Sequence, residues 1–370
     1  MRVILTGGIT GGHIYPALAI ADQFKEFDSD AEFLYLGSDE GMERYIVPRY
    51  GYELKYIDSR WFDRSSPFKL AKTLFKNERG KRQAINVMKQ FKPDFVMSTG
   101  SFVSVPVVLA AKSLKIPVYI HEQNAYPGVA NKLLSKYARR VFLGFEAARK
   151  YFPSEKVVYT GNPVRSEFGE QNRECARDEL GIPQNDFVVL IFGGSLGAET
   201  INDIGLEIVN KYGNDDNVTI LFGTGKDYFE HVKNRLNAGG KEAPTNVRVM
   251  PYISEMAKML SASNVIICRS GALSTAEVTM AGRAAVFVPS PNVTGDHQYY
   301  NAKAVADNGG AVLITENGDV ELRVLNALKA LSTDATLLED MEEGSLKSAP
   351  VDAAKIICEE IISDVKARQK

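Results

Sequence analysis

Small residues, an arginine and a carboxylate follow a short apolar run in the last third of the chain. The sequence reads Cys268-Arg269-Ser270-Gly271-Ala272, and Glu277 comes five residues later. We expect a strand over 265–268 to end at this turn and a helix to begin near Leu273. Free backbone N–H groups and the positive dipole end of such a helix suit a phosphate. An acid about one turn further on can accept both hydroxyls of a ribose, so the segment predicts a nucleotide pocket.

Two further glycine-rich turns follow expected strands. The first is Gly7-Gly8-Ile9-Thr10-Gly11-Gly12-His13 after residues 3–5, and the second is Gly193-Gly194-Ser195-Leu196-Gly197-Ala198 after residues 188–192. Helices should begin after both turns, with Pro16 in the first turn of the earlier helix, where proline is tolerated. Glycines allow positive φ and close approach of a ligand. One such loop is weak evidence, whereas three spread over both halves favour binding of a phosphorylated ligand.

Length and composition limit the classes of protein to which the chain can belong. A chain of 370 residues is expected to form two domains, and 45% hydrophobic with 24% charged residues is typical of globular proteins. The net charge of −2 gives no indication of nucleic-acid binding. Cys175, Cys268 and Cys358 are few, odd in number and not in metal spacing, which fits a reducing cytosol. We expect no signal peptide, and no apolar run approaches the ~20 residues that span a bilayer. Any membrane contact should be peripheral.

Short apolar strands alternate with amphipathic helical segments along the whole chain, which predicts an α/β fold with parallel sheets. The expected strands lie near 2–6, 32–36, 53–57, 94–98, 117–121, 140–144, 157–160, 187–193, 218–222, 247–250, 265–268, 285–288 and 311–314. Gly161-Asn162-Pro163-Val164-Arg165 is the expected hinge. We therefore predict two doubly wound domains, 1–163 and 164–349, with a helix over 350–370 crossing back to the first. Ligands should bind beyond the carboxyl ends of the strands, in a cleft between the domains.

The motifs taken together resemble the MurG family of bacterial N-acetylglucosamine transferases. The resemblance spans nearly the whole chain and rests on motifs in the family's order: Thr10-Gly11-Gly12-His13, His121-Glu122-Gln123-Asn124, Gly161-Asn162-Pro163-Val164-Arg165, Gly193-Gly194-Ser195-Leu196-Gly197-Ala198, Arg269-Ser270-Gly271-Ala272 with Glu277, and Gln298 with Asn301. It implies the GT-B fold, in which two Rossmann-like domains face each other across a cleft. It also implies transfer of N-acetylglucosamine from UDP-N-acetylglucosamine (UDP-GlcNAc) to lipid I, forming lipid II in peptidoglycan synthesis.

The resemblance assigns the donor to the C-terminal domain. Glu277 would accept the ribose hydroxyls, main-chain groups near Ile253 would contact uracil, and Ser195 would contact the diphosphate. The remaining donor-binding positions are Asn124, Arg165, Ala272, Leu273, Ser274, Thr275, Ala276 and Gln298. Taken alone, Glu277 fits better a solvated or dipole-neutralising acid early in a helix, and the motif context favours the ribose contact instead.

The N-terminal domain would receive the lipid-linked acceptor, beside Thr10, Gly11 and Gly12. His13 begins a helix, where the dipole favours the neutral, proton-accepting ring, so it is a candidate general base. A histidine there can also simply cap the helix. Glu122 is the competing base. The resemblance implies single displacement with inversion. Helix N-termini and Arg165 could stabilise the leaving diphosphate, so we predict no cofactor and no bound metal.

Residues 60–92 combine basic and aromatic side chains. Ten basic residues stand against Asp63 and Glu78, with apolar side chains between them. Such a stretch can bind an anionic membrane surface, and the predicted contacts are Trp61, Phe68, Lys69, Lys72, Phe75 and Lys76. The alternative is a solvated basic helix with its apolar side facing the core. By resemblance the protein would act at the cytoplasmic face of the membrane, with cell-wall synthesis or division proteins as possible partners.

Three positions depart from the family pattern. Ile9, Ser101 and Val105 stand where glycine is common, and their side chains could crowd the acceptor diphosphate. They leave open a related transferase with another lipid or small acceptor. A non-catalytic nucleotide-sugar-binding protein is a second alternative, disfavoured by the presence of both His13 and Glu122. A nicotinamide enzyme is disfavoured because the first loop is not G-x-G-x-x-G.

Overall fold

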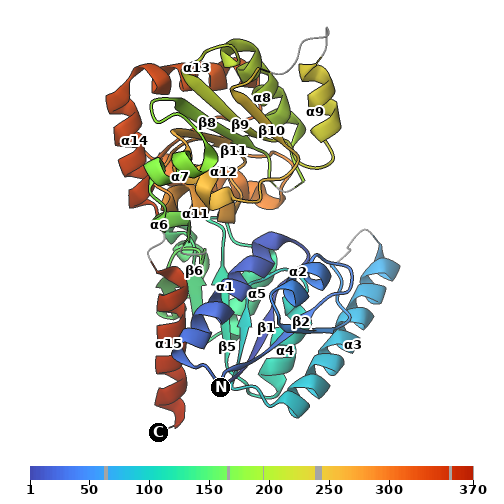
Figure 1. Cartoon of the computed structure of the whole chain (residues 1–370). Coiled ribbons are helices and arrows are strands. Elements are labelled where there is room, and N and C mark those ends of the chain that lie inside the picture. The colour runs from blue at the N-terminus through green and yellow to red at the C-terminus, as the bar shows by residue number, and fades with distance from the viewer. Residues whose placement is uncertain (62–65, 165–166, 195, 238–243, 350–351, 370) are drawn as a thin grey trace. The chain divides into compact units, whose positions relative to one another are not determined.

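The computed structural model describes residues 1–61, 66–164, 167–194, 196–237, 244–349 and 352–369. It divides into two compact units, Met1–Val164 with Pro350–Lys370, and Arg165–Ala349 (Figure 1). The boundary lies one residue beyond the predicted one, and the C-terminal segment joins the first unit.

The first unit is built on a parallel sheet of seven strands in the order β3-β2-β1-β4-β5-β6-β7, among its described residues. The strands are β1 (Arg2–Thr6), β2 (Glu32–Gly37), β3 (Glu53–Tyr56), β4 (Phe95–Ser98), β5 (Val118–Glu122), β6 (Arg140–Leu143) and β7 (Val157–Tyr159). The α-helices are α1 (Gly11–Phe27), α2 (Glu43–Arg49), α3 (Pro67–Phe91), α4 (Ser104–Ser113), α5 (Val129–Leu134) and α15 (Ala353–Gln369), with short 3₁₀ turns at Ser135–Tyr137, Glu146–Tyr151 and Ser154–Lys156.

The second unit repeats the architecture with six parallel strands in the order β10-β9-β8-β11-β12-β13, again among described residues. They are β8 (Phe187–Phe192), β9 (Val218–Gly223), β10 (Val247–Met250), β11 (Val265–Cys268), β12 (Ala284–Phe287) and β13 (Ala311–Leu313). The helices are α6 (Glu167–Glu170), α7 (Arg173–Leu180), α8 (Glu199–Tyr212), α9 (Phe229–Leu236), α10 (Met256–Ala262), α11 (Ala272–Met280), α12 (His297–Ala306), α13 (Val320–Thr333) and α14 (Ala335–Lys347), with a 3₁₀ turn at Thr294–Asp296.

Both faces of the first sheet are buried under helices, which explains why its central strands are largely apolar runs. Val3 and Leu5 of β1 belong to one apolar layer, and Ile4 between them belongs to the other. The first layer also holds Ile357 and Ile361 of α15, which lies alongside α1 (Figure 1). The C-terminal helix therefore completes the core of the first unit.

The predicted place of Pro16 is wrong. Helix α1 begins at Gly11 with Thr10 as its N-cap, so Pro16 lies in the second helical turn. The ring removes one hydrogen bond to the carbonyl of Gly12, which lies at an exposed position. Water can satisfy that carbonyl, so the helix continues through the proline.

Candidate functional site

His13 lies at the carboxyl edge of the first sheet, in the first turn of α1. Its ring is half-buried, and Nδ1 lies 2.9 Å from the carbonyl oxygen of Thr99, which directly follows β4. The Thr99 hydroxyl in turn donates to the carbonyl oxygen of His13 at 2.6 Å. A side chain at Gly7 would meet that hydroxyl at 2.0 Å, so glycine is required there. The two strand ends and α1 thus fix the histidine.

The contact with Thr99 determines which nitrogen of His13 carries the proton. A carbonyl oxygen only accepts hydrogen bonds, so Nδ1 must donate and the neutral ring keeps its lone pair on Nε2. Burial lowers the pKa of His13 below 6.5, while hydrogen bonding to Thr99 and Gln123 and the charge of Glu43 act in the opposite direction. The ring is therefore neutral at pH 7, with a nitrogen able to accept a proton.

Glu122, the last residue of β5, is engaged on all sides. Only 1% of it is exposed. One oxygen accepts from the backbone N–H and side-chain amide of Asn124 at 3.0 and 3.2 Å. The other accepts from the Gly128 N–H at 3.1 Å and the Asn131 amide at 2.9 Å. Four donors fill the lone-pair positions of a carboxylate. Glu122 therefore shapes the loop after β5 and has no oxygen directed at solvent.

His121 and Gln123 extend this network. The Nε2 atom of His121 lies 3.2 Å from the carbonyl oxygen of Gly161, so Nε2 carries the proton and Nδ1 accepts from the Gln123 amide at 3.1 Å. Burial lowers the pKa of His121 to about 4. The Asn162 amide donates to the carbonyl oxygen of Gln123 at 3.0 Å. The expected hinge segment is thus attached to the first unit through Gly161 and Asn162.

Two of the positions that depart from the family pattern keep a glycine-like backbone. Ile9 has φ of 74° and Ser101 has φ of 69°, both in the left-handed region that disfavours side chains, most of all β-branched ones. Val105 lies within α4 and is not in that region. Thr10 caps α1 without a side-chain hydrogen bond, and Gly11 and Gly12 follow it.

In the second unit the turn after β11 leads directly into α11, with Gly271 as the N-cap. Ala272, Thr275 and Ala276 are buried, whereas Leu273, Ser274 and Glu277 are half-exposed. Leu273 and Glu277, four residues apart, share one helix face. The predicted ribose-binding acid therefore lies on the accessible side of the helix that begins at the turn.

Gln298 and Asn301 of α12 hold the same turn. The Ser270 hydroxyl donates to the backbone carbonyl of Gln298 at 2.8 Å, and the Asn301 amide donates to the carbonyl of Ser270 at 3.1 Å. The side-chain oxygen of Gln298 accepts the Ser290 N–H at 2.9 Å. This bond directs the oxygen toward Ser290 and leaves the NH₂ group of the same side chain to donate elsewhere. The sequence motif joining these residues corresponds to a real contact between α11 and α12.

The loops after β8 and β9 pack against each other through glycines. Gly197 has φ of 83°, and a side chain there would meet the carbonyl oxygen of Thr224 at 2.2 Å. Gly225 also has φ of 83°, and a side chain there would lie 2.4 Å from the backbone nitrogen of Gly197. Ile253 is buried near the carboxyl end of β9, against Gly223. Ser195 and Arg165 lie outside the described residues, so their predicted roles stay predictions.

A cavity of about 750 Å³ lies at the opposite edge of the second sheet. Phe187, Asn217 and Asn264, which begin or precede strands, line it together with Arg173 and Arg177. Because parallel strands present their ligand-binding loops at the carboxyl edge, this cavity is not where a nucleotide is expected.

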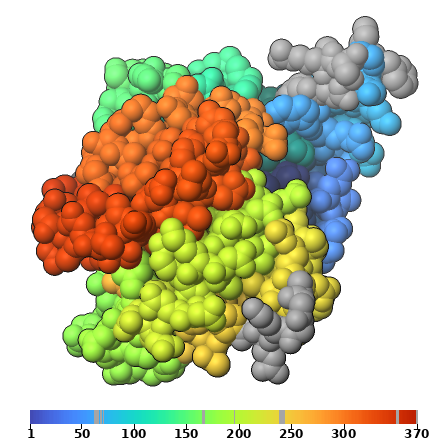
Figure 2. Space-filling model, turned by 90° about the horizontal axis from the view of Figure 1, so that it is seen from above, coloured from blue at the N-terminus to red at the C-terminus, as the bar shows by residue number. Residues whose placement is uncertain are grey.

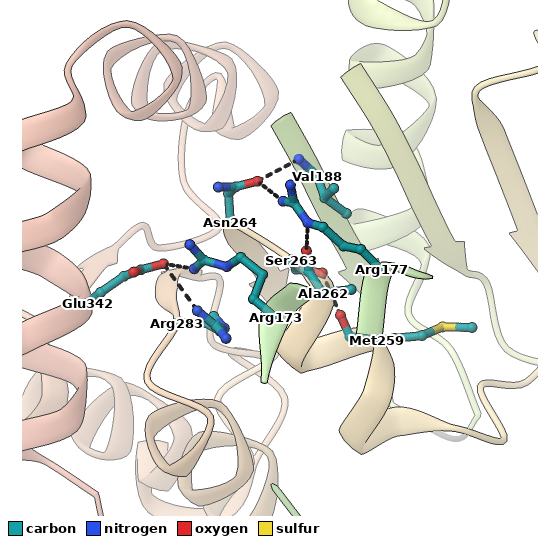
Figure 3. Close-up of polar contacts among 9 residues, drawn as sticks. All are labelled: Arg173, Arg177, Val188, Met259, Ala262, Ser263, Asn264, Arg283 and Glu342. Atoms are coloured by element: carbon teal, nitrogen blue, oxygen red, sulfur yellow. Dashed lines mark hydrogen bonds and ion pairs between the residues drawn. The ribbon is translucent and has the colours of Figure 1, made fainter. Parts of the chain in front are cut away.

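The polar side chains beside this cavity form hydrogen bonds and ion pairs with one another and with nearby backbone groups (Figure 3). Arg177 donates to the carbonyl of Ala262 at 2.9 Å and to the Asn264 side chain at 2.8 Å, and that same Asn264 oxygen accepts the Val188 N–H at 2.8 Å. Glu342 of α14 pairs with both Arg173 and Arg283. Burial lowers the pKa of Arg283 to about 10. These contacts join α7, α10 and α14 and serve the fold.

Helix α3 carries the basic and aromatic residues and lies at the surface of the first unit, in the light-blue area of Figure 2. Trp61 before the helix is 59% exposed and Phe75 is 73% exposed. Lys69 and Lys72 are exposed, and Lys76 is half-buried. Phe68 lies in the helix, but its side chain is outside the description. Among the described helices, none is long and apolar enough to cross a membrane.

Residues 3–143 match the glycosyltransferase family 28 N-terminal domain, and residues 188–357 match the C-terminal domain of that family. A protein of Acetivibrio thermocellus is 38% identical over 99% of this chain and 98% of its own length. Its name is UDP-N-acetylglucosamine–N-acetylmuramyl-(pentapeptide) pyrophosphoryl-undecaprenol N-acetylglucosamine transferase. A protein of the same name from Desulforudis audaxviator is 42% identical over 93% of both chains.

The crystal structure of MurG from Acinetobacter baumannii superposes with a TM-score of 0.77 and 32% identity, covering 98% of this chain and 99% of that one. The chain belongs to the MurG family. It is a glycosyltransferase with the predicted α/β, GT-B class of fold, and the resemblance found in its motifs is confirmed. A UDP-GlcNAc 2-epimerase from Neisseria meningitidis shares the fold at 17% identity and a TM-score of 0.69, over 98% of this chain and all of that one.

The predicted site residues of each unit lie at one edge of its sheet. In the first unit the structure brings His13, Glu122 and Asn124 to one sheet edge, and in the second it brings Ile253, the Ala272–Glu277 segment and Gln298 to one edge. Sequence reasoning missed Thr99 and Glu43. Thr99 follows the strand next to β1, so adjacency of strand ends could have indicated it, whereas nothing in the sequence marks Glu43 as buried.

Proposed function

We propose that the chain transfers N-acetylglucosamine from UDP-GlcNAc to the 4-hydroxyl of the N-acetylmuramoyl residue of lipid I, giving lipid II with inversion at the anomeric carbon. The observation that carries this proposal is the full-length similarity to relatives whose names specify this donor and this pyrophosphoryl-undecaprenol acceptor. The reaction supplies peptidoglycan synthesis, and through it cell-wall growth, cell shape and division.

His13 is the general base in this proposal. Its lone pair lies on Nε2 because Nδ1 donates to Thr99, and its lowered pKa keeps the ring neutral at pH 7. Glu122 is disfavoured because four N–H donors already occupy its oxygens and almost none of it is exposed. The acceptor hydroxyl would give its proton to His13 Nε2 as its oxygen attacks the anomeric carbon. Thr10, Gly11 and Gly12 lie beside this ring in the chain and are proposed acceptor contacts.

The second unit holds the donor in this proposal. Glu277 would accept the two ribose hydroxyls, the N–H groups at the start of α11 would bind the diphosphate, and backbone groups at Ile253 would contact uracil. Gln298 has an amide group directed away from Ser290 and able to donate to the donor sugar or phosphate. Asn124, Arg165 and Ser195 remain proposed contacts of the sugar and the diphosphate.

The leaving UDP carries negative charge, which helix N-termini and an arginine can stabilise. We expect transfer without a protein-bound metal or an organic cofactor. Among the described residues, no group of three or more His, Cys, Asp or Glu side chains is placed to hold a metal ion. The expectation is tested by assaying transfer in a chelator, with and without added Mg²⁺.

The exposed face of α3 is the proposed membrane contact. Trp61, Phe75 and Leu74 present apolar surface beside Lys69 and Lys72, a combination suited to anionic lipid headgroups. A lipid-linked acceptor requires such docking at the cytoplasmic face of the membrane. Proteins of cell-wall synthesis or division are proposed partners at that surface.

Acceptor identity is tested with labelled UDP-GlcNAc and a short-chain lipid I analogue. The proposal expects a β-1,4-linked disaccharide on the lipid and release of UDP. Label that reaches a different lipid but leaves lipid I unmodified would instead support a related transferase. Binding of donor without any transfer would support a non-catalytic nucleotide-sugar-binding protein.

A further inference from the structure

A second carboxylate, Glu43, lies buried beneath the first glycine-rich loop. It is fully enclosed, with 0% exposure, at the start of α2. One oxygen accepts the backbone N–H of Ile9 at 2.8 Å, and the other accepts the N–H of Ser38 at 2.9 Å. Each oxygen thus receives one backbone donor from a different segment. The side chain joins the loop before α1 to the turn after β2.

Ile9 is held from both sides by the same short segment. Its N–H donates to Glu43, and its carbonyl oxygen accepts the N–H of Met42 at 3.3 Å. The residue has φ of 74°, a conformation that is strained for a β-branched residue and persists only when surrounding contacts enforce it. The Met42–Glu43 segment supplies those contacts.

The surrounding backbone leaves space for this carboxylate. A side chain at Gly41 would lie 2.0 Å from a Glu43 oxygen, and one at Gly8 would lie 2.5 Å from the other. A side chain at Gly37 would meet the Glu43 stem at 2.8 Å. Glycines in the loop after β1, at the end of β2 and in the segment before α2 therefore surround the group. Because Glu43 takes the Ile9 N–H, that N–H is not available to a phosphate.

We infer that Glu43 is a positioning residue for the transfer reaction: by fixing Ile9 in its left-handed conformation, it holds the start of α1 and keeps the His13 ring against Thr99. This inference rests on the proposed function, because it gives His13 the role of base. Glu43 does not itself reach the reacting atoms. It acts through the three residues, Thr10, Gly11 and Gly12, that separate Ile9 from His13.

The charge of Glu43 also acts on His13. The titratable groups facing the ring are Glu43 from α2, which raises its pKa, and His121 from β5, with the Tyr35 hydroxyl bonded to Gly7 at 2.9 Å nearby. Removing the negative charge should lower the pKa of His13 further. The fall of the transfer rate in acid, which reflects protonation of His13, would then move to lower pH. An added carboxylate near the ring would move it to higher pH.

The test compares Glu43→Gln with Glu40→Gln, which changes an exposed carboxylate three residues away. Glu43→Gln should lower kcat about ten- to a hundredfold, leave the KM for UDP-GlcNAc unchanged, and lower the His13 pKa measured by NMR. The chain has only four histidines, so the His13 signal can be assigned by substitution. Glu40→Gln should change none of these quantities.

Adding Ile9→Gly to Glu43→Gln separates positioning from charge. Glycine adopts positive φ without assistance, so the double variant should recover most of kcat while the His13 pKa stays low. If Glu43→Gln folds only together with Ile9→Gly, the inference is likewise supported. It is overturned if Glu43→Gln keeps the parental kcat and His13 pKa, if Ile9→Gly restores no activity, or if neither variant folds. If His13→Gln retains activity, His13 is not the base. The His13 pKa measured by NMR in the parent and in Glu43→Gln would still test whether Glu43 acts on His13.

Discussion

The Nδ1 atom of His13 and the carbonyl oxygen of Thr99 lie 2.9 Å apart, and the Thr99 hydroxyl donates back to the carbonyl of His13 at 2.6 Å. This reciprocal pair fixes both the orientation of the ring and the nitrogen that carries its proton. His13 therefore keeps a lone pair on Nε2, whereas the lone pairs of both Glu122 oxygens already accept hydrogen bonds. This contrast distinguishes the two candidate bases.

Replacing His13 with Ala should lower kcat by a factor on the order of 10²–10⁴, the usual contribution of a positioned base. Binding of UDP, measured by calorimetry, should be unchanged, because the proposed contacts of its uracil and ribose lie in the other unit. Equal losses in UDP affinity and kcat would point to a binding role for His13 instead.

Replacing Glu122 with Gln should affect stability more than chemistry. One carboxylate oxygen becomes an amide that faces N–H donors, which leaves donors unpaired and costs about 1–3 kcal/mol of unfolding free energy. Denaturant unfolding measures this loss. The kcat of the folded enzyme should stay within a few-fold of the parent, and a loss as large as that of the His13 variant would identify Glu122 as the base.

Replacing Glu277 with Ala should chiefly raise the KM for UDP-GlcNAc, roughly ten- to a hundredfold. This range corresponds to losing ~1.5–3 kcal/mol of charged hydrogen bonding to the ribose. Glu277→Gln keeps the size and one acceptor, so its KM should rise less. The KM of the parent for 2′-deoxy and 3′-deoxy donors should approach the KM of Glu277→Ala for UDP-GlcNAc. If neither the substitution nor the removal of a ribose hydroxyl changes KM, Glu277 does not belong to the donor site.

Asp364 anchors α15 to the first sheet and should give a stability that disappears in acid. It accepts from Arg139 at 2.6 and 2.9 Å and from the Tyr119 hydroxyl at 2.6 Å. The hydrogen bond with Arg139 lowers the pKa of Asp364 below 3.8. A lowered folded-state pKa means that the stabilisation is present above pH 3.8 and is lost as pH falls through the lower value.

Asp364→Asn should therefore lower the unfolding free energy by about 1–2 kcal/mol at pH 7, a modest figure because Arg139 is exposed. The difference from the parent should shrink below pH 3.8. Glu359→Gln, at an exposed position of the same helix, serves as the control. A difference that persists undiminished at pH 2.5 would show that the contact acts without its charge.

Changing Lys69, Lys72 and Lys76 together to Glu should weaken sedimentation with anionic vesicles. Each basic residue near such a surface contributes about 1 kcal/mol at low salt, so the loss should exceed a hundredfold in the partition coefficient. Binding to vesicles of neutral lipid should change little.

A variant with Lys211, Lys233 and Lys329 changed to Glu carries the same change in net charge on the second unit. It should bind anionic vesicles like the parent. Equal weakening by both variants would mean that overall charge, and not the α3 face, governs membrane binding.

Most of the strands were predictable because they are apolar runs enclosed on both faces, and every expected strand is present within about one residue of its predicted bounds. The helix over 353–369 was predictable from its apolar spacing, and the structure groups it with the first unit. The place of Pro16 was not, because a helix can begin at glycines that sequence rules assign to the preceding loop.

The choice of base also could not be made from sequence. His13 and Glu122 are both chemically suited to it, and only the donors that surround Glu122 distinguish them. Glu43 gave no signal, since an acid in a polar segment is normally exposed. Its burial depends on glycines at positions 8, 37 and 41, which become neighbours only after the sheet has formed.

The pH dependence of kcat/KM for transfer to a lipid I analogue tests the role of His13 most directly. Because burial lowers the pKa of His13, the rate of the parent should rise to a plateau with an acid limb below pH 6.5, and Glu122→Gln should keep that limb. His13→Gln should abolish the limb together with most of the rate. A limb that persists in His13→Gln, or that disappears in Glu122→Gln alone, would contradict the assignment of His13 as the base.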